Sequence, residues 1–195
     1  MTAPTGRHPG ASRDPATHLL REAPVLETPR LRLRPFEPRD LDAHAASLAH
    51  PEIVRHLGGH PFGREDSWRR MLCGPGLWVM LGYGYWSVER RDDGLWLGQV
   101  GFADFKRDMT PSIEGLPEMG WVFAAHAQGR GYATEAVAAA LAWADQSVEA
   151  EQITAIIEPD NAASIRLAEK HGFAHREAAT YRDGPILLLR RFRSL

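Results

Sequence analysis

The chain has 195 residues, 44% of them apolar and 25% charged, which is typical of a single water-soluble globular domain. A formal net charge of -2 gives no basis for non-specific binding to nucleic acid or to an anionic membrane. A single cysteine, Cys73, excludes an internal disulfide framework.

The start of the sequence carries no targeting signal. Its first twenty residues lack the apolar core of a secretory signal, and no apolar run in the chain approaches the length that spans a bilayer. With the lone cysteine, these features predict a cytoplasmic protein. Residues 1–24 are rich in Pro, Gly, Ser, Thr and charge, so we expect a flexible leader with at most a short helix at "ATHLLREA". One domain is expected over residues 25–195.

The first ordered element is expected at "ETPRLRLRPF". Leu31 and Leu33 alternate there with Arg30, Arg32 and Arg34. A period of two predicts a strand that has its arginines in water.

Two helices are predicted next. "EPRDLDAHAASLAH" has a proline-led start and apolar residues at helical spacing, which indicates a helix. "PFGREDSWRRML" predicts a second helix with Trp68, Met71 and Leu72 on its buried side. From Leu77 to Phe105 the pattern favours strands, joined in a hairpin by the Asp93-Gly94 turn.

The second half alternates strands and helices. "PEMGWVFA" predicts a strand, "TEAVAAALAWA" a helix, "QITAIIEP" a buried strand and "ILLLRRF" a final strand. The Ala-rich helix has a buried stripe at Val137, Leu141, Ala144 and Val148. In "DNAASIRLAEKHGF" we expect a helix with Asp160 or Asn161 as N-cap, Gly172 in a left-handed conformation and Phe173 in contact beyond it. The fold class is therefore α/β (α+β), with helices around a mixed central sheet.

The glycine-rich turn "QGRGYA" at the mouth of the Ala-rich helix has two interpretations. Helix N-termini attract anions and glycine lets a phosphate approach the backbone, so the turn can be a pyrophosphate site. Alternatively, it is a tight turn that binds nothing. A P-loop is excluded because the chain has no Gly-Lys pair, and a dinucleotide fingerprint fails because Thr134 stands at its third glycine. His56 and His60 could share a metal, but a solvated loop explains them better.

Four segments together resemble the GNAT superfamily of acyl-CoA-dependent N-acyltransferases. Gln128, Gly131 and Ala133 match its R/Q-x-x-G-x-G/A signature. "TPRLRLRPFEPRDLD", "EMGWVF" and "NAASIRLAEKHGF" resemble its first strand, fourth strand and following helix, in the branch that contains the ribosomal-protein-alanine N-acetyltransferases. The resemblance extends from about Val25 to the C-terminus. It implies a single-domain fold whose fourth and fifth strands splay apart.

The resemblance also implies where acetyl-CoA, the acyl donor, binds, and it implies no metal. Backbone groups of Val122, Phe123 and Ala124 are expected to pair with the pantetheine arm. The pyrophosphate is expected on the turn and first helical residues: Gln128, Gly129, Arg130, Gly131, Tyr132, Ala133 and Thr134. Arg130 adds a charged contact or is simply solvated. Asn161 contacts the cofactor arm or only caps its helix.

The implied reaction is direct attack of an amine on a thioester, which raises two proton problems. Deprotonating a lysine amine at neutral pH costs about 4 kcal/mol, and an α-amine about 1 kcal/mol. Glu118 is our candidate base, unless it only orients substrate or pairs with an arginine. The tyrosine that many relatives use as acid is replaced by Ala168. Ser164 can donate a hydrogen bond to the sulfur or merely satisfy the first turn of its helix.

Several questions stay open at the level of the sequence. The aromatic residues Trp78, Tyr83, Tyr85, Trp86 and Trp96 line an acceptor pocket or form core packing. Cys73 is expected to be inert. The leading function is an N-acetyltransferase for a small or peptide α-amine. The alternative is a catalytically idle acyl-CoA-binding domain. A homodimer through the C-terminal strand is a further expectation.

Overall fold

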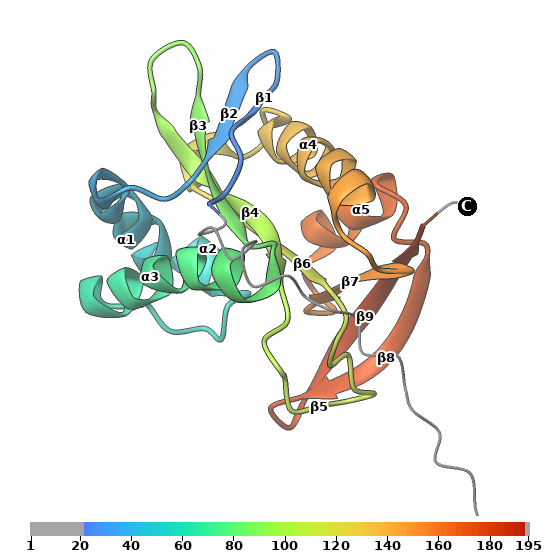
Figure 1. Ribbon diagram of the computed structural model, residues 1–195. Coiled ribbons are helices and arrows are strands. Elements are labelled where there is room, and N and C mark those ends of the chain that lie inside the picture. Colours follow the sequence, from blue (N-terminus) through green and yellow to red (C-terminus); the bar gives the residue numbers. More distant parts are fainter. Residues whose placement is uncertain (1–21, 194–195) are drawn as a thin grey trace, which may run out of the picture.

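A computed structural model describes residues 22–193, and within them nine strands form one mixed sheet (Figure 1). Their order across the sheet is β1-β2-β3-β4-β6-β7-β9-β8-β5, and every neighbouring pair is antiparallel except β6 and β7. The strands are β1 (Leu26–Glu27), β2 (Leu31–Arg34), β3 (Tyr85–Arg90), β4 (Trp96–Ala103), β5 (Met109–Thr110), β6 (Glu118–Phe123), β7 (Gln152–Ile157), β8 (His175–Tyr181) and β9 (Gly184–Phe192). This confirms the expected α/β fold with a mixed sheet.

Helices cover both faces of the sheet. They are α1 (Leu41–Ala49), α2 (Pro51–Val54), α3 (Arg64–Leu81), α4 (Tyr132–Ser147) and α5 (Ala162–Lys170), with short 3₁₀ turns η2 (Pro38–Asp40) and η3 (Ala125–Ala127). Helices α1 to α3 lie on one face, and α4 and α5 on the other (Figure 1). None of the helices in residues 22–193 is long and apolar enough to cross a membrane.

The main core lies between the sheet and α4. The predicted stripe on this helix is confirmed, because Val137, Leu141, Ala144 and Val148 are all at most 8% exposed. Leu31 and Leu33 of β2 reach the same core and are fully buried, as their alternation predicted. A firmly packed helix has a fixed axis, so the direction in which its N-terminus points is fixed as well.

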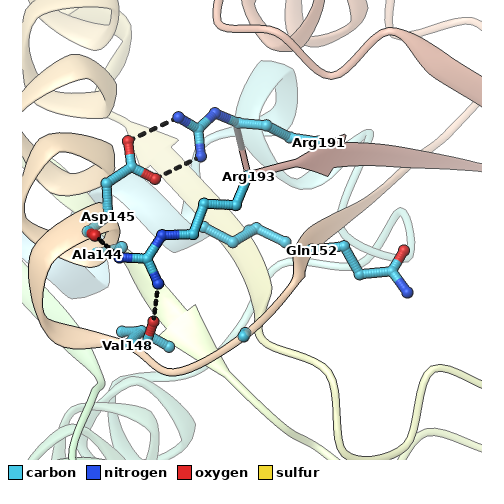
Figure 2. Close-up of a pocket in the computed structure, with 8 residues that line it drawn as sticks. Ala144, Asp145, Val148, Gln152, Arg191 and Arg193 are labelled. Atoms are coloured by element: carbon cyan, nitrogen blue, oxygen red, sulfur yellow. Dashed lines mark hydrogen bonds and ion pairs between the residues drawn. The ribbon is translucent and has the colours of Figure 1, made fainter. Parts of the chain in front are cut away.

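The C-terminus of α4 is tied to β9 by two arginines (Figure 2). Asp145 accepts two hydrogen bonds from Arg191, both 2.7 Å, while Arg193 donates to the carbonyl oxygens of Val148 and Asp145. Cations at this end of a helix are favoured by its dipole and satisfy its last carbonyl groups. The small cavity between these side chains, about 10 Å³, has room for roughly one water molecule and is a packing feature.

The expectation that all three arginines of "RLRLR" lie in water is wrong for Arg34. Its side chain is buried and donates to both carboxylate oxygens of Asp40, at 2.7 and 2.8 Å, and to Glu89 at 2.7 Å. Two acids from η2 and β3 thus compensate a charge that strand alternation alone places in solvent. Burial by itself would raise the pKa of the Asp40 carboxyl, but the hydrogen bonds from Arg34 outweigh it and lower that pKa.

Asp40→Asn is therefore expected to destabilise the fold by about 3–5 kcal/mol at neutral pH, because it removes one of the two carboxylates that compensate the buried charge of Arg34. Since the native pKa of Asp40 is depressed, its carboxylate stabilises the fold above the unfolded value of about 3.9. The difference from wild type should shrink as the pH falls below that value. Urea unfolding of both proteins, at neutral pH and below a pH of about 3.9, measures this difference in the free energy of unfolding. Asp42→Asn, at an exposed acid that pairs with Arg64, is the matched control and should cost at most about 1 kcal/mol.

Helix α3 is longer than the sequence indicated. The chain from Leu77 to Leu81 is helical, not strand, and Leu72 is 55% exposed. The buried side instead carries Ser67, Met71, Gly74 and Trp78, a helical spacing that continues straight through Pro75. The "GPG" sequence favours a break, but Phe36 packs on Gly74 so closely that an added Cβ would lie 2.9 Å from its ring. Tertiary packing thus outweighs local propensity here.

Most of the other local features predicted from the sequence are present, but two strands were missed. The Asp93-Gly94 hairpin, the Asn161 cap, left-handed Gly172 and buried Phe173 are confirmed. Strands β5 and β8 were not anticipated. They matter because β9 pairs along its length with β7 and β8, so the C-terminal strand has no open edge through which a second copy could pair.

The last residues of the expected leader lie within the described range. Most of residues 1–24 lies outside the described range, as does most of "ATHLLREA". Within that range, Ala23 is 7% exposed and belongs to the core, and the carbonyl oxygen of Pro24 accepts a hydrogen bond from Trp86 Nε1 at 2.7 Å. Ala23 and Pro24 thus contact the packed domain.

Candidate active site

A groove opens where the two parallel strands of the sheet part. Strands β6 and β7 pair only at Glu118 and Thr154, and the Thr154 N–H donates to the carbonyl oxygen of Pro117 at 2.9 Å. Beyond that pair the strands diverge, as the sequence comparison implied (Figure 1). The groove has a volume of about 1730 Å³, more than the roughly 300–1,000 Å³ of a pocket for one small ligand. It can hold a long ligand and a second reactant.

Backbone groups of β6 that have no strand partner face this groove. The N–H of Ala124 donates to Leu97 of β4, and its carbonyl oxygen accepts from Ala127, so both of its polar groups are already used. Because hydrogen bonding alternates along an antiparallel ladder, Val122 also points its backbone groups towards β4. Phe123 points its groups the other way, towards the gap beside β7. Of the three residues expected to hold an extended amide chain, Phe123 therefore has the suitable geometry.

The glycine-rich turn presents a run of free backbone donors. Among residues 22–193, no acceptor lies within hydrogen-bonding distance of the N–H groups from Gly129 to Thr134. Gly129 and Gly131 have φ values of 70° and 77°, which only glycine adopts without strain, and Gly131 is the N-cap of α4. Six adjacent donors at the positive end of a helix are suited to bind an anion. Of the predicted residues here, the groove is lined by Gln128, Gly129, Gly131, Tyr132, Ala133 and Thr134.

Arg130 does not line the groove, whereas an arginine from the other end of the chain reaches the turn. Arg30 donates from Nη1 to the carbonyl oxygen of Arg130 at 3.0 Å, and its guanidinium carbon lies 4.8 Å from the ring centre of Tyr132. Arg30 also pairs with Glu135 in the first turn of α4, at 2.6 Å. The alternating pattern of its segment hid this role, because it marked Arg30 only as an exposed strand residue.

Glu118, the candidate base, is paired with an arginine. It is 4% exposed, and Arg107 donates to both of its carboxylate oxygens, at 2.5 and 2.7 Å. Arg107 in turn donates to the hydroxyl of Tyr181 in β8 at 2.9 Å. Burial opposes the charge of Arg107, but the hydrogen bonds and charge of Glu118 outweigh it and raise the pKa of Arg107. No local pattern in the sequence pointed to Arg107 or Tyr181.

The first turn of α5 holds the other two predicted side chains. Asn161 Oδ1 accepts a hydrogen bond from the Ser164 N–H at 3.1 Å, so its capping role is present. Ser164 Oγ accepts from Trp121 Nε1 of β6 at 3.3 Å. That contact links α5 to β6 across the splay. Because Ser164 accepts in this contact, its own hydroxyl proton is free to donate into the groove. Asn161 and Ser164 both line that groove.

Comparison with known proteins agrees with this geometry. Residues 30–174 match the model of the family described as "Acetyltransferase (GNAT) domain". The chain belongs to the GNAT acetyltransferase family. It is therefore an N-acetyltransferase by class, as the motifs suggested.

Individual relatives extend the similarity beyond that segment. YkkB of Bacillus subtilis, an uncharacterised protein, is 30% identical over 85% of this chain and 94% of its own length. A solved structure of a GNAT-family acetyltransferase from Bordetella pertussis is 30% identical, with a TM-score of 0.75 over 87% of this chain and 99% of that one. A ribosomal-protein-S5-alanine acetyltransferase from Vibrio fischeri shares the fold at 18% identity, with a TM-score of 0.65 over 88% and 98%.

In this GNAT acetyltransferase the aromatic cluster is divided between core and groove. Trp78 and Trp86 pack edge-on against each other and against Trp143, and Trp96 is 6% exposed. Tyr83 packs against the same core. Only Tyr85 among the five lines the groove. Core packing, the second of the two interpretations, thus accounts for most of the cluster.

The groove is also lined by a cysteine and by a cluster of one histidine and two acids. Cys73 is exposed and lines it. Within residues 22–193, the one set of three potential metal ligands is His56, Glu158 and Asp160. His56 Nδ1 lies 3.0 Å from Glu158, and Arg55 lies 3.2 Å from Asp160. These contacts explain the cluster as pairing between the loop after α2 and the start of α5, and we assign no metal to it.

Proposed function

We propose that this GNAT acetyltransferase transfers the acetyl group of acetyl-CoA to a primary amine, a peptide N-terminus or a small-molecule amine. The observation that carries the proposal is the run of unpaired N–H groups from Gly129 to Thr134 at the end of the β6–β7 groove. A diphosphate fits six convergent donors, and a pantetheine chain fits a groove with a free strand edge.

The residues present fit the cofactor in three places. The amides of Gly129 to Thr134 would hold the pyrophosphate, with charge from Arg30 and, at longer range, Arg130. The backbone of Phe123 would pair with the pantetheine amides. Asn161 and Ser164 line the same groove near the point where the strands part, so both would contact the arm. No metal is part of the proposal.

Glu118 would receive the proton of the attacking amine. A carboxylate has about four lone-pair sites, so its pairing with Arg107 leaves one on each oxygen for an amine or a water. The ion pair also keeps the carboxylate in one orientation at the first residue of the splay. It thus fits both roles considered for Glu118, since pairing with an arginine does not prevent acceptance of a proton.

The acceptor is proposed to be an α-amine. Proteins of this fold act on various amines. A spermidine N-acetyltransferase from Vibrio cholerae, solved with CoA and spermine, and an aminoglycoside acetyltransferase, solved with CoA, share the fold at 17% and 22% identity. Fold alone therefore does not decide the acceptor. The α-amine is favoured because it is easily deprotonated and because the first strand resembles the ribosomal-protein branch.

The cofactor is tested first by thermal unfolding with acetyl-CoA, CoA, NAD or ATP added separately. A ligand at a hundred times its dissociation constant should stabilise the fold by about 2.7 kcal/mol, which raises Tm by several degrees. We expect this for acetyl-CoA and CoA and not for NAD or ATP. Free thiol released from acetyl-CoA with a panel of amines then measures transfer. Stabilisation by CoA with no thiol release would favour the idle binding domain. Turnover of lysine-type amines but not of N-terminal peptides would exclude the α-amine.

Two wider expectations accompany this function. We propose that the protein works in the cytoplasm without nucleic acid or membrane partners, in line with its net charge of -2 and its single cysteine. A homodimer would have to form through a face, through β1, or through the part of β8 that β5 leaves unpaired, since β9 is paired on both sides. Size-exclusion chromatography with light scattering measures the oligomeric state.

A further inference from the structure

The family's usual proton donor is missing from this chain. Its position on α5 holds Ala168, which is fully buried, and the side of α5 that lines the groove carries Ala163, Ser164 and Leu167. Of these only Ser164 is polar, and its oxygen already accepts from Trp121. A hydroxyl of this kind can hydrogen-bond a sulfur but is a poor acid. The other wall of the groove carries a phenol, Tyr85.

Tyr85 of β3 lies across two strands to reach β6. Tyr85 is in register with Gly101 of β4, and Gly101 is in register with Gly120 of β6. A Cβ added to Gly120 would lie 2.3 Å from the Tyr85 hydroxyl oxygen, and one added to Gly101 would lie 2.4 Å from the Tyr85 Cα. Gly101 is therefore required for the close approach of the β3 backbone, and Gly120 for the position of the Tyr85 hydroxyl. This gives a physical reason for the glycine in "EMGW".

The position of the Tyr85 hydroxyl suits a reacting group. It touches β6 two residues after Glu118, on the same face of the strand, and it lines the groove. Among residues 22–193, no side chain or backbone group makes a hydrogen bond with it, and the nearby Glu118 and Tyr181 are both hydrogen-bonded to Arg107. The hydroxyl is not among the buried side-chain atoms that lack a partner, so it is open to the groove and can donate to a ligand bound there.

The surroundings keep this phenol protonated. Burial raises the pKa of Tyr85 above its ordinary value of about 10, and the negative charge of Glu118 raises it further. Arg107 and Arg70 act in the opposite direction and would stabilise the ring oxygen whenever it loses its proton. Tyr85 thus carries a proton that it can donate at neutral pH, and the two arginines stabilise the phenolate that remains.

We propose that Tyr85 delivers the proton to the departing sulfur, in place of the absent tyrosine on α5. The inference rests on the proposed function. The amine nitrogen forms a bond to the carbonyl carbon, and the carbon–sulfur bond breaks with its electron pair on sulfur. Sulfur takes the hydroxyl proton of Tyr85. The phenolate recovers a proton from the nitrogen, through Glu118 or a water, so the products are an amide, a free thiol and unchanged Tyr85.

This relay resolves a mismatch in acidity. A phenol is a weaker acid than a thiol of pKa near 8.5, so a lasting transfer from Tyr85 alone would be uphill. The nitrogen that has just bonded to the carbonyl carbon is a far stronger acid. Net movement of a proton from nitrogen to sulfur is downhill, and Tyr85 with Glu118 connects the two ends.

Tyr85→Phe tests the proposal, with Tyr83→Phe as matched control on the same segment but against the core. We expect Tyr85→Phe to lower kcat at least about a hundredfold, the low end of about 10²–10⁴ for acid–base groups, with KM for acetyl-CoA changed less than twofold. Tyr83→Phe should leave kcat unchanged. With 3-fluorotyrosine at position 85, the alkaline limb of the kcat profile should move to lower pH. Wild-type kcat in Tyr85→Phe, or an unmoved profile with 3-fluorotyrosine, would overturn the proposal.

A binding measurement needs no turnover. If Tyr85 donates to the sulfur, wild type should bind CoA more tightly as the pH rises through the thiol pKa of about 8.5, whereas desulfo-CoA should show no such gain. Calorimetry should find the gain lost in Tyr85→Phe and kept in Tyr83→Phe. An equal gain in Tyr85→Phe would place the donor elsewhere. If wild type releases no thiol with any amine, the proposed function fails, and this comparison still decides whether Tyr85 contacts sulfur.

Discussion

Gly131→Glu is expected to weaken the binding of CoA and acetyl-CoA at least about a hundredfold. Gly131 is the N-cap of α4 and lies within the run of unpaired N–H groups. Glutamate there would bring a negative charge to the proposed phosphate site, and like charges in contact cost several kcal/mol. Its Cβ would also lie 3.4 Å from Arg30 Nη2, so the new carboxylate could draw that arginine away from the turn. Isothermal titration calorimetry measures the affinity.

The strain of a left-handed backbone must be separated from the effect of charge. Gly94 has a φ of 70°, close to the 77° of Gly131, and an added Cβ there meets no atom within 4 Å. Gly94→Glu therefore has a similar backbone strain of about 1–3 kcal/mol and the same charge, but in the β3–β4 hairpin away from the groove. It should bind CoA normally. Near-normal CoA affinity in Gly131→Glu would mean that the phosphate site has been misplaced.

Elements set by local patterns were predictable from the sequence. The buried stripe of α4, the Asn161 cap and the Asp93-Gly94 turn each depend on residues within a few positions of one another, and each is present. The glycine-rich turn belongs to the same class. Its two left-handed residues are required by local backbone geometry, whatever the rest of the fold does.

What the sequence did not reveal depends on contacts between distant residues. Arg34 has the alternation of an exposed strand residue, yet Glu89, 55 positions away, makes its burial tolerable. Helix α3 continues through Pro75 because Phe36 and the sheet pack against its inner side. In both places a tertiary partner outweighs a local signal.

The candidate site divides in the same way. Glu118 was selected from the motif "EMGW", but its partners Arg107 and Tyr181 come from a loop and a strand that only the folded chain brings to it. Tyr85 was one of five aromatic residues until the register of β3, β4 and β6 distinguished it. Strand register sets which side chains share a row, and no short motif encodes it.

Glu118→Gln is expected to lower kcat at least about a hundredfold while CoA affinity stays within twofold. The amide keeps the shape of the side chain but cannot accept the proton of an amine, and positioned bases contribute about 10²–10⁴. The loss should be larger for a lysine-type amine than for an α-amine, since deprotonating the first costs about 3 kcal/mol more. Thiol release, measured with one acceptor of each kind, gives both ratios.

The same substitution also leaves Arg107 without its charged partner, so a loss of stability must be distinguished from a loss of catalysis. Glu89 provides the control because it is 5% exposed and pairs with Arg34 at 2.7 Å outside the groove. Glu89→Gln should destabilise the fold about as much as Glu118→Gln, by about 3–5 kcal/mol, but spare kcat below the unfolding transition. Equal kcat values in both variants would remove Glu118 as the base. Its ion pair would then serve only to hold β6 and β8 together at the mouth of the groove.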